Sequence, residues 1–97
     1  RQELAQRLQA APSIVQREFR RCTDAIDQAF KTRTHAERLR PFEFDLCKPG
    51  TLSDTELVLL QDLLKLEGWC VVLSAPLEWK GEGSRPLGLQ FRHNPDE

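Results

Sequence analysis

Residues 51–73 constrain the fold most strongly, because they predict a capped helix that leads directly into an apolar strand. Ser53 and Glu56 have the capping-box spacing that starts a helix. Gly68 predicts the end of this helix, and the apolar residues 69–73 predict an interior strand. One half of the predicted helix consists of leucines that a core must cover: Leu57, Leu59, Leu60, Leu63, Leu64 and Leu66.

Two more strands are indicated by alternation of apolar and polar residues. In residues 41–46, Phe42 and Phe44 alternate with Glu43 and Asp45, which is typical of a half-buried strand. Residues 87–91 alternate in the same way and predict a last strand, and residues 80–86 read as a hairpin loop.

The first forty residues predict helix. Pro12 interrupts a stripe of apolar residues, and Ser13 and Gln16 have the capping-box spacing, so we expect one helix to end near Ala11 and another to begin near Ser13. A single helix kinked at Pro12 is the alternative. Residues 31–40 are polar and basic, and they predict a hinge that ends at Pro41.

Together these elements predict one α+β domain over residues 1–97, with two N-terminal helices followed by a β-α-β-β unit that forms a three-stranded mixed sheet. A right-handed crossover would make the first two strands parallel. We expect the strand at residues 69–73 in the centre, and the competing order has the last strand there. The N-terminal helices either cover the second face of the sheet or pack beside the leucine helix and leave that face open.

Charge is distributed unevenly. Residues 1–41 carry nine Lys or Arg against five Asp or Glu, and residues 42–97 carry five against ten. This asymmetry fits attraction between the halves, attraction between two copies of the chain, or a nucleic-acid surface. The basic residues that could contact phosphates are Arg17, Arg20, Arg21, Lys31, Arg33, Arg38 and Arg40. Acidic residues are interleaved with them.

Two features indicate protein contact. The stripe formed by Val15, Phe19, Ile26 and Phe30 predicts packing on the core or on a second copy. Trp79 lies beside the predicted hairpin loop, where an exposed aromatic side chain would mark a binding edge.

The cysteines Cys22, Cys47 and Cys70 lie 25 and 23 residues apart, which matches no zinc pattern. We interpret them as buried apolar residues in a protein of the cytoplasm or another reducing intracellular compartment. His35 and His93 are isolated in sequence. We therefore predict no catalytic residue, no metal site and no cofactor.

The sequence predicts a non-enzymatic protein that acts by protein–protein contact, as an oligomer or as a subunit of an assembly. Nucleic-acid binding through the basic segment is the alternative. In general appearance the succession of a helical N-terminus, FEFDL, residues 53–73 and LGLQF looks like the small α+β accessory proteins that phage genomes encode. This resemblance implies no specific functional residue.

Overall fold

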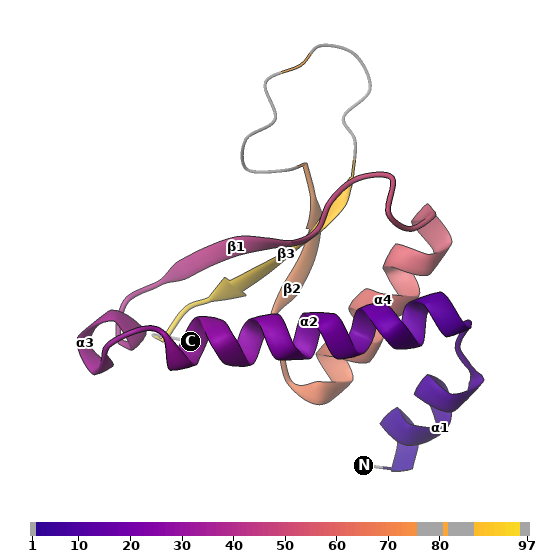
Figure 1. Cartoon of the computed structure of the whole chain (residues 1–97), viewed down its shortest axis with the longest axis horizontal. Coiled ribbons are helices and arrows are strands. Elements are labelled where there is room, and N and C mark those ends of the chain that lie inside the picture. The colour runs from indigo at the N-terminus through magenta and orange to yellow at the C-terminus, as the bar shows by residue number, and fades with distance from the viewer. Residues whose placement is uncertain (1, 76–80, 82–86, 96–97) are drawn as a thin grey trace.

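The computed structural model describes residues 2–75, 81 and 87–95. Its elements, shown in Figure 1, are α1 (Gln2–Ala10), α2 (Ser13–Lys31), α3 (His35–Arg38), β1 (Phe42–Cys47), α4 (Asp54–Glu67), β2 (Val71–Ser74) and β3 (Gly88–His93). The α+β class is confirmed, as are the break between the first two helices and the β-α-β-β order. In the part of the chain that the structure describes, no helix is long and apolar enough to cross a membrane.

The sheet has the order β1-β3-β2, and both pairings are antiparallel. The predicted mixed sheet with residues 69–73 in its centre is therefore wrong, and the competing order with the last strand in the centre is confirmed. The burial of the strands explains this order. Residues 88–91 of β3 are all buried, whereas Val71 is the one fully buried residue of β2.

The helices that contact the sheet pack on one of its faces. Phe44, Phe91 and Val71 lie in register across the three strands, and they belong to the same core as the buried residues of α2 and α4. Helices α2 and α4 also pack against each other. The arrangement is thus two layers, with Glu43 and Arg92 on the opposite face of the sheet.

Helix α4 begins and ends as its sequence predicts. The side chain of Ser53 accepts a hydrogen bond from the backbone of Glu56, whose carboxylate accepts one from the backbone of Ser53. Gly68 has a φ of 108°, and the backbone N–H groups of Gly68 and Trp69 donate to Lys65 and Leu64. This Schellman arrangement needs a left-handed residue, which glycine supplies without steric cost.

The expected capping box at Ser13 is wrong. Pro12 occupies the N-cap position and Ser13 is already helical, so its hydroxyl makes no capping hydrogen bond. The side chain of Gln16 instead donates to the carbonyls of Ala11 and Gln9, which fixes the turn between α1 and α2.

Residues 31–40 contain a short helix that our hinge prediction missed. Thr34 and Glu37 form a reciprocal capping box at the start of α3. The spacing of these two residues was a visible signal for this helix start.

Candidate functional site

Aromatic side chains gather at one end of the sheet, around Phe30 in the last turn of α2. The Phe30 ring centroid lies 5.0 Å from His93, 5.4 Å from Phe42, 5.9 Å from Phe91 and 6.0 Å from Trp69. We call these five residues the aromatic end. They come from α2, β1, β3 and the segment between α4 and β2, so this cluster joins the helical layer to two strands of the sheet and to the start of the third.

Polar contacts hold the aromatic end in place. The guanidinium of Arg33 lies 3.9 Å from the Phe42 ring centroid, a cation–π contact. His93 Nε2 lies 3.0 Å from the carbonyl oxygen of Arg38. Because a carbonyl oxygen only accepts hydrogen bonds, Nε2 carries the proton and donates it, which ties α3 to the end of β3.

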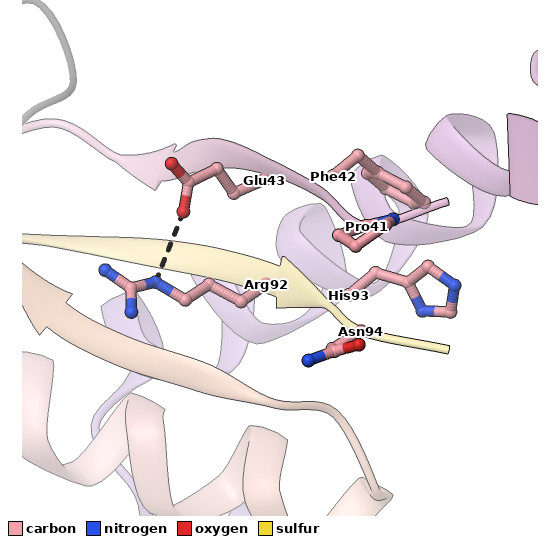
Figure 2. A pocket seen from close by; sticks show the side chains of 6 residues that line it. All are labelled: Pro41, Phe42, Glu43, Arg92, His93 and Asn94. Atoms are coloured by element: carbon pink, nitrogen blue, oxygen red, sulfur yellow. Dashed lines mark ion pairs between the residues drawn. The ribbon is translucent and has the colours of Figure 1, made fainter. Parts of the chain in front are cut away.

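Two adjoining hollows flank the end of β3. Figure 2 shows the first, of about 350 Å³, where Phe42 and His93 lie next to each other. Its lining residues are Pro41, Phe42, Glu43, Arg92, His93 and Asn94. The second hollow, also of about 350 Å³, shares Arg92, His93 and Asn94 and is lined further by Phe30 and Trp69. The aromatic rings thus form the walls of two neighbouring depressions.

Charged and apolar groups surround these hollows. Glu43 and Arg92 form an ion pair with 3.4 Å between Oε2 and Nε, and about half of each side chain is exposed. Leu39, two residues before Pro41 in the chain, is 62% exposed, which is the largest exposure among the large hydrophobic residues described. An aromatic centre with a partly charged rim has the composition of a protein-binding surface.

The structure separates the residues of the predicted contact stripe. Val15, Phe19 and Ile26 are buried in the core, where a partner could not contact them without opening the fold. Phe30 is half-buried and belongs to the aromatic end. Trp79 lies outside the described residues, so its predicted partner contact stays a prediction.

The predicted phosphate-contacting residues also have different environments. Arg33 and Arg38 donate hydrogen bonds to the carbonyls of Ala29 and Phe30 at the end of α2, where a helix leaves carbonyls without helical partners. Arg21 forms an ion pair with Glu18 near the middle of α2 and donates a hydrogen bond to its carboxylate. All of the set except Arg33 are exposed, and Arg17, Arg20, Lys31 and Arg40 make no side-chain hydrogen bond or ion pair with described residues.

A second cluster lies where α2 passes the end of β1. Cys22 and Cys47 are 0% and 3% exposed, and their Sγ atoms lie 3.9 Å apart. Arg21 Nη2 lies 3.3 Å from the Cys47 sulfur, and Glu18 Oε1 lies 3.6 Å from it. All three cysteines were predicted to be buried, which is confirmed for Cys22 and Cys47 and wrong for Cys70, which is exposed. The proximity of Cys22 and Cys47 was not predicted.

Hydrogen bonding and charge make the two thiols different. The hydrogen bond with Cys22 and the positive charge of Arg21 lower the pKa of Cys47, against the opposite effect of burial. The same hydrogen bond and burial raise the pKa of Cys22. The hydrogen bond to Glu18 raises the pKa of Arg21, so this guanidinium stays charged beside the sulfur. Among the described residues, no group of three or more His, Cys, Asp or Glu side chains is placed to hold a metal ion.

Comparison with protein-family models, with curated proteins and with solved structures finds no match to this chain.

Proposed function

We propose that this protein acts through protein–protein contact and that it assembles with a second copy of itself through the aromatic end. The observation that supports this proposal is the pair of aromatic-lined hollows on either side of His93, whose ring contacts the carbonyl of Arg38, the residue before the exposed Leu39. We propose no chemical reaction for this surface.

The residue types at the aromatic end favour a protein partner. Side chains of Trp and Arg are enriched at positions that dominate binding energy in interfaces, and Trp69 and Arg92 both line the second hollow. The contacts among these rings leave them few alternative conformations, so a partner would lose little entropy in ordering them. An apolar side chain such as Leu39 from another molecule fits the chemistry of either hollow.

The charged rim favours a second copy as that partner. A twofold interface brings the same patch of two molecules together, so the patch must be complementary to itself. Glu43 and Arg92 supply opposite charges on one patch, and the Arg92 side chain of one copy can pair with the partner's Glu43. The exposed Leu39 side chain would be the apolar group that enters a hollow of the partner in such an interface.

His93 supports a binding role over a catalytic one. Its Nε2 donates to a backbone carbonyl, and its ring packs against Phe30 and Phe42 with centroids 5.0 and 4.9 Å away. These contacts fix the ring as part of the wall. General acid or base catalysis would need a ring nitrogen directed at a reacting group.

Mass in solution tests the proposal. Sedimentation equilibrium over the micromolar range should show a reversible dimer, and Leu39→Glu should weaken dimerisation by at least about tenfold because it places a charge in an apolar contact. Val58→Glu is the matched control, because Val58 is 45% exposed on α4 and lines neither hollow. A monomer at every concentration, or equal weakening by both variants, would contradict this interface.

A further inference from the structure

We propose that Cys22 and Cys47 form a redox-active thiol pair that closes to a disulfide when a hydroperoxide oxidises Cys47. The sulfur atoms lie 3.9 Å apart, in contact but unbonded, and they come from residues 25 positions apart in the chain. This proposal is independent of the binding surface, since neither cysteine lines its hollows.

A bulge in β1 directs Cys47 toward the helix. The pairing of β1 with β3 shifts between Asp45 and Cys47, and Leu46 and Cys47 are consequently both buried. In a regular strand, adjacent residues point to opposite faces, so Cys47 would point away from α2. Bulges commonly redirect a side chain next to a functional site. Here the bulge brings the Cys47 sulfur to Cys22.

The Arg21 guanidinium favours a thiolate at Cys47, and the Glu18 carboxylate, which holds this guanidinium in place, partly opposes it. The Arg21 guanidinium makes three hydrogen bonds of 3.0 to 3.1 Å to the Glu18 carboxylate, and its Nη2 also contacts the Leu46 carbonyl and the Cys47 sulfur. A neighbouring cation stabilises a thiolate, which is the nucleophilic form of cysteine. The same cation argues against a bound metal ion, because it occupies the position beside the sulfur.

A small oxidant has a route to this sulfur. A hollow of about 340 Å³ lies against the cluster, and Glu18, Arg21 and Leu46 are among its lining residues. The Arg21 side chain is 47% exposed, whereas Cys47 is 3% exposed, so the guanidinium lies between the thiol and solvent. Cys47 itself does not line this hollow, so the route for a molecule the size of hydrogen peroxide requires movement of the Arg21 side chain.

The reaction balances with one hydroperoxide. The Cys47 thiolate attacks one peroxide oxygen and the O–O bond breaks, which gives a sulfenic acid and, after protonation, water or an alcohol. The Cys22 thiol then loses its proton and attacks the Cys47 sulfur, the S–S bond forms, and the sulfenic oxygen leaves as water. The two thiols are oxidised by two electrons in total and the peroxide is reduced by the same two.

Hydrogen peroxide added to the folded full chain tests this assignment by mass spectrometry and thiol labelling. We expect a mass lower by two hydrogens, a Cys22–Cys47 cross-linked peptide and full reversal by dithiothreitol. Cys70→Ser should behave like the wild type, because Cys70 is exposed and separate from the pair. Cys22→Ser should accumulate a Cys47 sulfenic acid that dimedone traps.

Charge variants test the part that Arg21 plays. Arg21→Gln should slow bridge formation by at least about tenfold, whereas Arg20→Gln, on the exposed side of the same helix, should leave the rate unchanged. Arg21→Lys keeps the charge and should retain much of the rate if Arg21→Gln fails to fold. Disulfides that involve Cys70 instead, or Cys22 and Cys47 still reduced at peroxide levels that oxidise free cysteine, would overturn the proposal.

Discussion

Gly88, the first residue of β3, is packed against backbone. A Cβ atom at this position would collide with the carbonyl oxygen of Cys47 and would also contact the Pro49 ring. A backbone carbonyl held in a strand cannot move aside as a flexible side chain can. The close approach of β3 to the end of β1 therefore depends on the absence of a side chain.

We predict that Gly88→Ala lowers the free energy of unfolding by about 1–3 kcal/mol, as overpacking in a core does. Urea unfolding monitored by circular dichroism measures the change. Gly50→Asn is the comparison for backbone strain alone, because no atom lies within 4 Å of a Cβ there and any loss of stability comes from the positive φ of 88°. A Gly88→Ala protein as stable as the wild type would show that the strands can separate at little cost.

For single residues, sequence patterns predicted burial well, but they predicted poorly which residues contact each other. The leucines at 57, 60, 63 and 64 are buried as their spacing predicts. The Cys22–Cys47 contact was not predicted, because a local pattern shows which side of an element is apolar but not which other element packs against that side. The similar lengths of the end of α2 and of β1 were the signal for this contact. From Cys22 to the end of α2 the helix rises about 14 Å, and β1 from Phe42 to Cys47 returns about 17 Å.

Among the elements, α3 depends most visibly on its cap. The hydrogen bonds from the backbone and the side chain of Thr34 lower the pKa of Glu37. A lowered folded-state pKa means that the capped form is favoured above the ordinary pKa of a glutamate and is lost as pH falls through the lowered value. The start of α3 should therefore loosen in acid.

We predict that an NMR titration places the pKa of Glu37 below that of an ordinary glutamate and that Thr34→Ala returns it toward the ordinary value. Thr32→Ala is the matched control, since the Thr32 hydroxyl donates to Gln28 and Ala29 carbonyls and does not contact Glu37. Unchanged titration of Glu37 in Thr34→Ala would rule out the capping box as the cause.

The capping-box spacing occurs at the start of three helices, and our predictions for the three differed in accuracy. Ser53 with Glu56 was predicted correctly, Thr34 with Glu37 was overlooked, and Ser13 formed no cap. Spacing alone does not determine which residue lies just before the helix. Pro12 takes that position at α2, because its ring fixes φ near the value that a helix start needs.

In the whole molecule, the attraction between the basic half and the acidic half is mainly long-range, without direct ion pairs between described residues of the two halves. Three ion pairs between described residues join Glu3 with Arg7, Glu18 with Arg21, and Glu43 with Arg92, each within one half. The Glu3–Arg7 and Glu43–Arg92 pairs are exposed and add little to stability, whereas the carboxylate of the Glu18–Arg21 pair is buried. The surplus positive charge of the helical half thus remains available to an external partner.

Nucleic-acid binding is the alternative function that this charge suggests, and salt dependence tests it. The exposed side chains of Arg17, Arg20 and Lys31 make no hydrogen bond or ion pair with described residues, so we expect about three phosphate contacts from α2. The logarithm of the affinity for duplex DNA should then fall against the logarithm of salt with a slope of about −3, and binding should vanish near physiological salt. A markedly steeper slope that Arg17→Gln and Arg20→Gln reduce would favour the nucleic-acid function.

The global arrangement was only partly predictable. Class, element order and the leucine helix follow from periodicity, whereas strand order depends on which pairings bury most surface. The run at 69–73 is apolar throughout, but Trp69 and Cys70 precede β2, which leaves a four-residue strand at the edge. The aromatic end unites Phe30, Phe42, Trp69 and His93, which are too far apart in sequence for any local pattern to group them.

The central position of β3 has a consequence for synthesis on the ribosome. Among the described strands, β1 and β2 each pair with β3 and not with each other, so neither gains this neighbour until residues 88–93 have left the exit tunnel. Phe42 therefore stays unpaired until His93, its register partner in β3, has been synthesised. During this interval the helices can form from local contacts, while two unpaired strands remain exposed to other nascent chains and to chaperones.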